Sequence, residues 1–507
     1  MSRMSRTTAI LLALALGGCP SPQDDTDDGT GGGEDTHVEV VRDTPREEPP
    51  ASGPARDVQF PAVTRNNTTS GLEVNTVQFG ELPVVYLRLV VKSGTASDPS
   101  ALPGVAHFVA QMLKEGTRTR TSAQLAEAIE FLGADISVGE DEENVYIMIR
   151  ALSDHLDEAM AILADVARNP RFDEAELRRF KRRELTRLAL SSQEARYLAR
   201  RTFYSELYGS HPYARVDTTP AAVERISRRD LSAWHRTHFV PNNAFLVAVG
   251  NVDPSAVSAA ADRHFRGWTR HDVPDVTYPD LPAPSARRVV VVDRPESVQS
   301  VIFVGNLALR RNDPDFVPLS VANQVLGGSA ASRLFMDLRE QRSLTYGAYS
   351  TIAERSEVGP FVAYASVRNE VTAEAMRGFM EHLDRIVAET PPDAEVADAR
   401  RFLSDSFPLQ IETAGRVASM IQELRIFGLP DDYWDGYRSA IRSVTPAQAH
   451  EAATRYIHPD QALIVAVGRA ADIVEPLRTY GEVRVVDTDG NPVVEGSPAA
   501  EPTPAAR

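Results

Sequence analysis

Two kinds of hydrophobic periodicity alternate along the central part of the chain. The stretches PVVYLRLVVKSG (83–94) and NVYIMIRAL (144–152) contain alternating or continuous apolar runs, which predict β-strands. The stretch TSAQLAEAIEFLG (121–133) has helical apolar spacing, a Thr–Gln capping box and a terminal glycine, and SDHLDEAMAILADVARNP (153–170) is a second amphipathic pattern, so both predict helices. Strands and helices mix without a regular strand–helix–strand order. We therefore predict an α+β fold, a largely antiparallel sheet with helices packed on one face.

The central part of the chain also repeats itself. HFVPNNAFLVAVG (238–250) is echoed by YIHPDQALIVAVG (456–468) at an offset of 218 residues, and DPSALPGVAHFV (98–109) aligns with DPDFVPLSVANQ (313–324) at an offset of 215. Two matches in the same order and at nearly one offset are not expected by chance. The sequence therefore predicts two tandem copies of one domain.

Helix signals and composition set the boundaries of the two copies. Ser227 and Thr445 occupy the same place before the repeated strand, and each predicts a helix N-cap. The Pro-rich stretch DVPDVTYPDLPAPSA is typical of a joint between domains. We predict an N-terminal domain over residues 59–276, a linker over 277–288 and a C-terminal domain over 289–485.

The two ends of the chain have a different composition. Residues 1–18 combine two arginines, a short apolar run and small residues, which predicts an export signal peptide. The stretch LGGC (16–19) resembles a bacterial lipobox, in which the cysteine, here Cys19, is lipidated. Residues 19–58 carry eleven Asp and Glu against three Arg and few large apolar residues, so we predict a flexible acidic tether. Residues 486–507 predict a disordered tail.

Composition and charge exclude several classes of function. The 507 residues are 42% hydrophobic and 25% charged, which is typical of a globular protein with a proper core. The formal net charge of −17 argues against nucleic-acid binding, which needs clustered Lys and Arg. The single cysteine allows no internal disulfide. The lipobox resemblance implies a lipoprotein of the cell envelope, and the lack of an Asp directly after Cys19 favours the outer membrane, facing the periplasm.

The stretch GVAHFVAQMLKEGT (104–117) has the frame of a zinc-peptidase helix. On a helix, residues at i, i+3 and i+4 share a face, so His107, Ala110 and Gln111 lie together. A metal site would require Glu and His at the last two positions.

Three stretches carry a resemblance to a known family: GVAHFVAQMLKEGT, AEAIEFLGADISVGEDEENVYI and RNPRFDEAELRRFKRREL. They resemble the pitrilysin/insulinase family of inverted zinc peptidases, which have an H-x-x-E-H motif on a helix. In that family two histidines and a later glutamate bind zinc, and the glutamate inside the motif is the general base. The resemblance covers about residues 59–485 and agrees with the repeat.

Aligned with that family, this chain differs at the metal-binding and general-base positions. His107 matches the first metal ligand, but Ala110 replaces the general base and Gln111 replaces the second ligand. Arg187, a permanent cation, stands at the position of the third ligand. Glu184, one turn earlier, could be offered as a substitute for the third ligand. The site would then still contain only one histidine and one carboxylate, fewer than the three protein ligands that a catalytic zinc needs. We therefore predict that this chain binds no catalytic zinc, and that a partner subunit binds it instead.

The second repeat contains LGGSAASRLFMDLREQRSLTYGAYS (326–350). In the related family this region supplies an Arg and, seven residues later, a Tyr to the zinc site of the other half or of a partner subunit. Arg339 and Tyr346 have that spacing here. A guanidinium and a phenol suit the stabilisation of negative charge on the scissile carbonyl oxygen, because neither has to lose a proton at neutral pH. The residues that we expect to bind substrate beside them are Gly327, Gly328 and Ser329.

Three functional hypotheses follow. The first is the non-zinc-binding subunit of a heterodimeric zinc metallopeptidase, which has no activity alone and lends Arg339 and Tyr346 to a zinc-binding partner of the same family. Its substrates would be unfolded peptides that pair with a sheet edge. The second is a catalytically inactive peptide-binding or assembly scaffold, and the third is a self-sufficient metallopeptidase with an unrecognised metal site. The Arg–Tyr pair favours the first hypothesis, because a scaffold does not need oxyanion donors.

Overall fold

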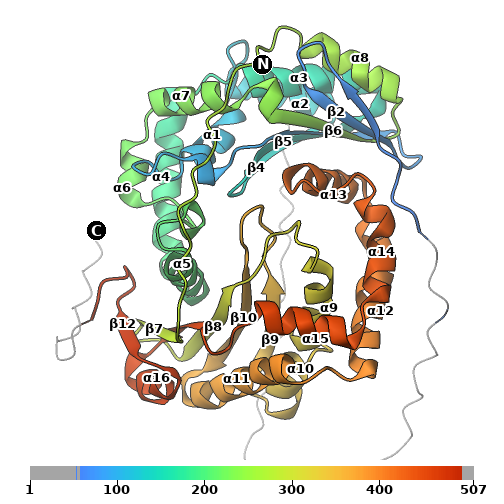
Figure 1. Cartoon of the computed structure of the whole chain (residues 1–507). Helices are drawn as coiled ribbons and strands as arrows, with labels where there is room; N and C mark the ends of the chain where they lie inside the picture. The colour runs from blue at the N-terminus through green and yellow to red at the C-terminus, as the bar shows by residue number, and fades with distance from the viewer. Residues whose placement is uncertain (1–52, 54–57, 494–507) are drawn as a thin grey trace, which may run out of the picture. The chain divides into compact units, whose positions relative to one another are not determined.

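A computed structural model describes residue 53 and residues 58–493 (Figure 1). The predictions for the signal peptide, for lipidation of Cys19, for nearly all of the tether and for the tail beyond residue 493 lie outside the described residues. Among the helices that the structure describes, none combines the length and the apolar character that crossing a bilayer requires. The fold is built on two sheets, each with its own set of helices.

The first sheet takes its strands from residues 64–250 and, in the described part of the chain, has six strands in the order β1-β2-β6-β3-β5-β4. Neighbouring strands are antiparallel except for β2 and β6, which are parallel. Strand β6, with the sequence AFLVAVG, is buried along its whole length, as expected for an apolar strand with neighbours on both sides. The strands are β1 (Thr64–Asn67), β2 (Glu73–Gln78), β3 (Val84–Val91), β4 (Asp135–Glu140), β5 (Val145–Leu152) and β6 (Ala244–Gly250).

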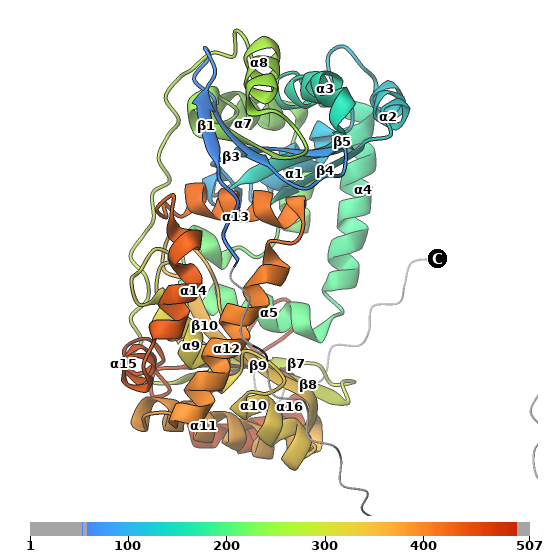
Figure 2. The same ribbon diagram turned by 90° about the vertical axis from the view of Figure 1, so that its right-hand side faces the viewer.

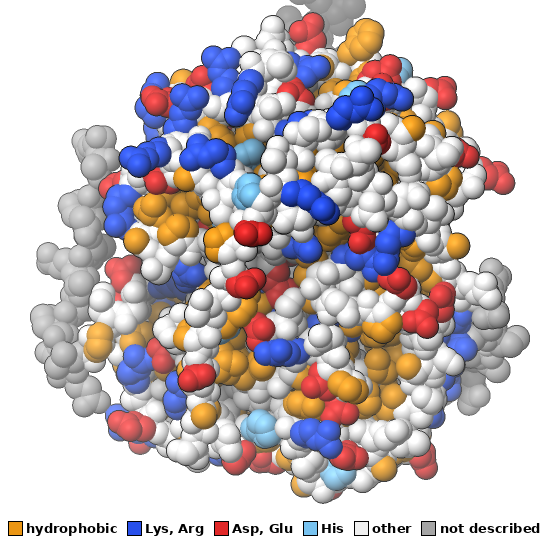
Figure 3. Space-filling model, turned by 45° about the horizontal axis from the view of Figure 1, so that its top comes forward, with side chains coloured by type: hydrophobic (Ala, Val, Ile, Leu, Met, Phe, Trp, Pro, Cys, Tyr) orange, Lys and Arg blue, Asp and Glu red, His pale blue; other side chains and the backbone are white. Residues whose placement is uncertain are grey.

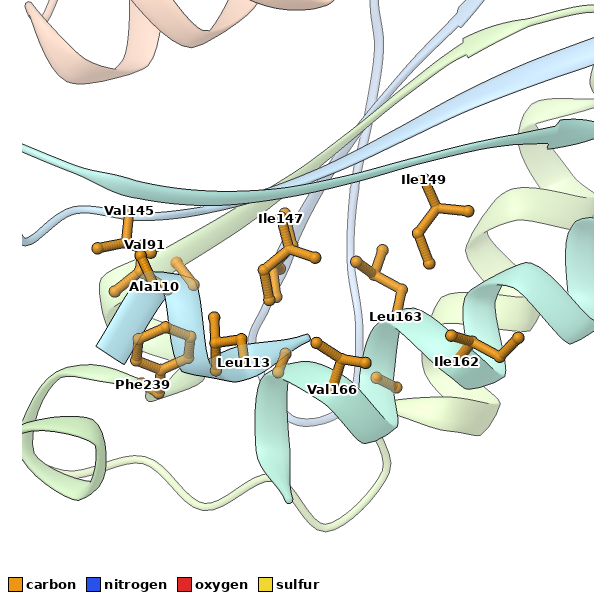
Figure 4. Packing of buried hydrophobic residues seen from close by; sticks show 14 of the residues in the cluster. Val91, Ala110, Leu113, Val145, Ile147, Ile149, Ile162, Leu163, Val166 and Phe239 are labelled. Carbon is orange, nitrogen blue, oxygen red and sulfur yellow. The ribbon is translucent and has the colours of Figure 1, made fainter. Parts of the chain in front are cut away.

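Helices of the N-terminal half share one hydrophobic core with one face of this sheet. Figure 4 shows this core, where residues of α1 and α3 point toward apolar side chains of the strands. Helix α2 begins at the predicted capping box, in which the Thr121 and Gln124 side chains satisfy each other's backbone N–H groups. The helices are α1 (Val105–Leu113), α2 (Ser122–Phe131), α3 (Leu156–Arg168), α4 (Glu174–Ser191), α5 (Ala195–Tyr208), α6 (Pro220–Arg225), α7 (Arg228–His238) and α8 (Pro254–His264).

The second sheet takes its strands from residues 288–486 and repeats the pattern of the first. Its six strands in the described chain have the order β12-β7-β11-β8-β10-β9. Strand β7 is parallel to both β12 and β11, and the remaining neighbours are antiparallel. The strands are β7 (Arg288–Asp293), β8 (Gln299–Leu307), β9 (Thr345–Ile352), β10 (Pro360–Arg368), β11 (Leu463–Gly468) and β12 (Val483–Val486).

The helices of the C-terminal half pack on one face of this sheet and form a second core. A π-helical turn, Met336–Gln341, follows the short α10 and leads toward β9. The helices are α9 (Phe316–Leu326), α10 (Arg333–Phe335), α11 (Thr372–Ala388), α12 (Asp393–Gln410), α13 (Ala414–Ile426), α14 (Tyr433–Ser443), α15 (Pro446–Tyr456) and α16 (Ala470–Leu477).

Each sheet is covered on its other face by a helix from the opposite half. Helix α13 packs its apolar residues against β3 and β6 of the first sheet, beside which Figure 2 shows it. Helix α5 packs in the same way against β8 and β11 of the second sheet. The helix exchange buries apolar side chains from both halves in shared cores, so the halves stabilise each other.

Polar contacts also join the two halves. The turn between β4 and β5 contributes Glu142 and Glu143, and the turn between β9 and β10 contributes Arg355 and Ser356. Arg355 forms an ion pair with Glu142 at 2.7 Å, and the Ser356 N–H donates to Glu143 Oε1 at 2.7 Å. Burial raises the pKa of Glu143, although its hydrogen bonds with Tyr213 and Ser356 act in the opposite direction.

The predicted fold class and the predicted repeat are confirmed. Ser227 and Thr445 cap α7 and α15, each with a complete capping box, and the repeated strands are β6 and β11. The α+β class with largely antiparallel sheets also holds, and helices of each half share a core with one face of that half's sheet. The exchanged helices α5 and α13 are the additional feature that the sequence did not predict.

Candidate functional site

Helix α1 carries the face that the sequence singled out, and its N-terminus is held firmly. Gly104 adopts a left-handed φ of 98° just before the helix, where a Cβ would lie 2.5 Å from Thr218 Cβ. The Asp98 carboxylate accepts hydrogen bonds from the backbone N–H groups of Gly104 at 2.7 Å and Ala106 at 2.8 Å. Burial raises the pKa of Asp98 to about 7, although both hydrogen bonds act in the opposite direction.

His107 lies between two carboxylates, one on each side of its ring. Nδ1 is 2.6 Å from Oε1 of Glu140, which comes from the edge strand β4, and Nε2 is 3.5 Å from Oε2 of Glu184 on α4. Burial alone would lower the pKa of His107, but the two carboxylates overcome it and raise the pKa to about 9. The imidazole is therefore a cation at neutral pH.

The two positions next to His107 on this face contain no metal-binding group. Ala110 is completely buried, and Figure 4 shows it in the apolar core near Val91 and Val145. The Gln111 amide reaches only the far oxygen of Glu140, with Nε2 to Oε2 at 3.5 Å. An amide is a weak ligand for zinc, and a methyl group cannot take a proton.

Arg187 binds Glu184 on its own helix and Asp217 on the loop before α6. Its Nε and NH2 donate to the Glu184 carboxylate at distances between 2.6 and 3.1 Å, and NH2 also donates to Asp217 at 2.7 Å. The side chain of Glu184 is only 3% exposed. Burial would raise its pKa, but the hydrogen bonds from His107 and Arg187 lower the pKa to about 2. The hydrogen bond with Glu184 raises the pKa of Arg187.

These residues do not fit a catalytic zinc ion. The two carboxylates near His107 contact opposite ring nitrogens, so they cannot bind one ion together with a single nitrogen of that ring. The carboxylate of Glu184 already binds the guanidinium of Arg187, a fixed cation that would repel a second one. Among the described residues there is no group of three or more His, Cys, Asp or Glu that could hold a metal.

The ion-pair cluster gives a prediction for the pH dependence of stability. The pKa of His107 rises from its ordinary value of 6.5 to about 9, so the stabilisation is fully present below pH 6.5 and is lost as the pH rises through about 9. We expect His107→Gln to lower the free energy of unfolding by about 2 kcal/mol at neutral pH and by much less above pH 9. Urea denaturation of both proteins across this range measures the difference.

The matched control is His271→Gln, because His271 is exposed and its ring nitrogens contact only backbone oxygens. Any loss of stability in this variant should be the same at neutral pH and above pH 9. An equal, pH-independent loss in both variants would contradict a charged His107.

Arg339 and Tyr346 lie together in the structure. Tyr346 is the second residue of the edge strand β9, and 88% of its surface is exposed. Arg339 lies in the π-helical turn before it and donates from NH1 to the backbone oxygen of Tyr346 at 2.6 Å, and from Nε to Glu340 at 2.9 Å. The guanidinium also lies 5.3 Å from the centre of the Phe335 ring. Arg339 thus fixes the backbone from which the phenol projects.

The three residues expected beside this pair have internal contacts. Gly327 and Gly328 end α9 close to other groups: a Cβ at Gly327 would lie 2.3 Å from Ser350 Oγ, and one at Gly328 would lie 2.4 Å from Gln324 Oε1. Ser329 Oγ accepts a hydrogen bond from Gln324 Nε2 at 2.8 Å. Close packing against β9 and α9 explains the two glycines, and a substrate contact at these residues stays a prediction.

The structure therefore places the candidate residues in two groups, one on each half. Within the described chain, no hydrogen bond or ion pair links the His107 cluster to the Arg339–Tyr346 group. Sequence reasoning missed Glu140 and Asp217. Glu140 shares a strand face with Ile136 and Val138, which pack on the core beneath the helices, and this alternation was the signal available.

Two family models match the chain in tandem. Residues 79–220 match the model described as insulinase (peptidase family M16), and residues 225–403 match the model described as peptidase M16 inactive domain. Together they cover more than half of the chain. The chain belongs to the insulinase family, peptidase family M16. The first M16 match contains the His107 cluster, and the second contains Arg339 and Tyr346.

Similar proteins agree with the M16 assignment. An uncharacterized zinc protease of Mycobacterium tuberculosis is 27% identical over 375 residues, which are 72% of this chain and 83% of that protein. One of Streptomyces coelicolor is 25% identical over 395 residues, 76% of this chain and 85% of that protein. The crystal structure of a peptidase M16 inactive domain from Pseudomonas fluorescens has a TM-score of 0.76 and 27% identity, and covers 80% of this chain and 98% of its own.

A protease structure from Helicobacter pylori has a TM-score of 0.72 and 17% identity, and covers 80% of this chain and 99% of its own, a likeness of fold alone. The family resemblance predicted from the sequence is confirmed, and the protein has an M16 peptidase fold.

Proposed function

We propose that this M16 chain is the non-zinc-binding subunit of a two-chain zinc metallopeptidase, and that it supplies Tyr346 and Arg339 to its partner's active site. The observation that carries the proposal is the contrast between the two halves. At the position on α4 where related enzymes have their third metal ligand, this chain has a cation, Arg187, which is bound to the buried Glu184. The phenol of Tyr346, in contrast, projects from an edge strand and is 88% exposed.

The two residues suit the charge that develops during peptide hydrolysis. Negative charge builds on the scissile carbonyl oxygen, and a fixed donor aimed at this oxygen lowers the barrier. In the proposal the Tyr346 hydroxyl donates to that oxygen. Arg339 holds the Tyr346 backbone in place and adds positive charge nearby. The partner would supply the metal and the general base.

Unfolded peptides are the substrate class that we propose. Strand β9 pairs only with β10 in the described sheet, and its outer edge is partly occupied, because the Ser350 N–H donates to Gly327 O at 2.8 Å and Tyr346 O accepts from Arg339 NH1 at 2.6 Å. We propose that an added strand pairs with the short stretch between these two residues. A peptide bound there in extended form would run past Tyr346. The predicted lipid anchor at Cys19 would hold the pair at the outer membrane, facing the periplasm, and this location stays a sequence prediction.

The test is reconstitution with a companion M16 chain that has a complete H-x-x-E-H motif. This chain, the companion and the mixture are each assayed on a quenched fluorescent peptide. We expect cleavage only with the mixture. Equal activity of the companion alone would support the scaffold hypothesis, and cleavage by this chain alone would support a self-sufficient enzyme; either result would contradict the proposal.

A further inference from the structure

Two adjoining cavities surround the side chain of Tyr346. One has a volume of about 220 Å³ and the other about 460 Å³, and both are lined by Gln299, Thr345, Tyr346 and Ser366. They lie where the ends of β8, β9 and β10 meet, and α5 of the N-terminal half reaches the smaller one. The space around the exposed phenol is therefore shaped by both halves of the chain.

The charge of these cavities is opposite to that of the whole chain. The chain carries a formal charge of −17, and Figure 3 shows acidic and basic side chains interspersed over the face that it presents. The residues that line the two cavities include three arginines and one acid, a local net charge of +2. They are Arg196, Arg339, Arg368 and Glu340.

Arg196 differs from the other two arginines. Arg339 Nε donates to Glu340 Oε1 at 2.9 Å, and Arg368 Nε lies 3.9 Å from Glu370 Oε2. The guanidinium of Arg196, on α5, has no hydrogen bond or ion pair with any described residue. It lies 4.7 Å from the centre of the Tyr364 ring, a cation–π contact that orients it.

The aromatic support under Arg196 is itself fixed by its neighbours. The centre of the Tyr364 ring lies 5.8 Å from the centre of the Phe303 ring and 6.2 Å from the centre of the Tyr349 ring. Arg196 is exposed, but a guanidinium in contact with a fixed ring has lost part of its freedom before a ligand binds, so less entropy is lost when its N–H groups bind a carboxylate. None of those N–H groups is bound to another residue within 58–493.

We propose that Arg196 and the cavity beside Tyr346 form a subsite for the carboxylate of an acidic residue in a peptide. The inference rests on the proposed function, because it places a substrate peptide at Tyr346. A guanidinium binds a carboxylate through two parallel hydrogen bonds, which a neutral side chain of the same shape cannot reproduce. The subsite thus makes the chain selective for peptides with Asp or Glu next to the scissile bond.

Peptide binding to the full chain, without a companion, tests the subsite. Three short peptides that differ only in having Glu, Gln or Lys at the same positions are titrated by calorimetry at low and high salt. We expect the Glu peptide to bind the native chain roughly five- to tenfold more tightly than the Gln peptide at low salt. The preference should shrink at high salt, and Arg196→Gln should remove it.

Arg200→Gln is the matched control, because Arg200 is exposed one turn further along α5 and lines neither cavity. This variant should keep the preference for the Glu peptide. Equal binding of the Glu and Gln peptides to the native chain, an equal effect of both substitutions, or no binding of any peptide would overturn the subsite. None of these results bears on whether cleavage needs two chains, so failure of the subsite and failure of the proposed function are distinguishable.

Discussion

Tyr346→Phe should lower kcat for peptide cleavage by the reconstituted pair by about 100-fold, with little change in KM. The substitution removes only the phenol oxygen, which is the donor that we place on the developing oxyanion. A donor that acts mainly in the transition state affects kcat more than substrate binding. Tyr346 is 88% exposed, so the fold should be unaffected, and an unchanged urea midpoint of the variant will verify this.

Tyr480→Phe is the control for this experiment. Tyr480 follows α16 and packs at the edge of the second core, and it lines neither of the cavities around Tyr346. Its loss of the same oxygen should leave kcat within about twofold of the native pair. If Tyr346→Phe were as active as Tyr480→Phe, the role of this chain in the partner's active site would be excluded.

Arg187→Met should destabilise the chain about as much at neutral pH as His107→Gln. It removes the guanidinium that binds the carboxylate of Glu184, whose side chain is 3% exposed. Removing one partner of a buried ion pair leaves an uncompensated charge and is strongly destabilising. The Arg187 side chain is 43% exposed, so water can replace it in part. We therefore expect a loss of about 2 kcal/mol in the free energy of unfolding, measured by urea denaturation at neutral pH.

The same change at Arg183 provides the comparison. Arg183 lies one turn earlier on α4, its side chain is 62% exposed, and its nearest carboxylate is that of Glu115 at 3.6 Å. Exposed pairs of this kind contribute little, so Arg183→Met should cost less than about 0.5 kcal/mol. Equal losses in the two variants would mean that Arg187 is not the counterion that stabilises Glu184.

The helix face at His107 shows what the sequence could predict. Helical spacing is a local property, so the alignment of His107, Ala110 and Gln111 on α1 followed directly from the order of residues. The repeat was also visible, because two copies of one fold keep similar strands and caps. The partner of His107 on β4, Glu140, could not be found in this way. Its contact depends on how the edge strand packs against α1.

The role of Arg187 was predicted only in part. The alignment placed a permanent cation where a metal ligand stands in the family, and the structure shows this cation bound to the carboxylate of Glu184. Glu184 was considered as a substitute ligand, whereas the structure shows it bound to Arg187 and His107. Asp217 lies thirty residues beyond Arg187 on a loop, and no periodicity links a loop residue to a helix. The subsite at Arg196 depends on α5 reaching the second sheet, which is a tertiary feature.

The zinc content of this chain, purified alone, tests the account most directly. The protein is equilibrated with excess zinc, freed of unbound metal by gel filtration and analysed by mass spectrometry, beside the companion chain as a positive control. We predict that this chain retains far less than one zinc ion per molecule while the companion retains one. One tightly bound zinc ion per molecule of this chain, lost in His107→Ala, would contradict the account.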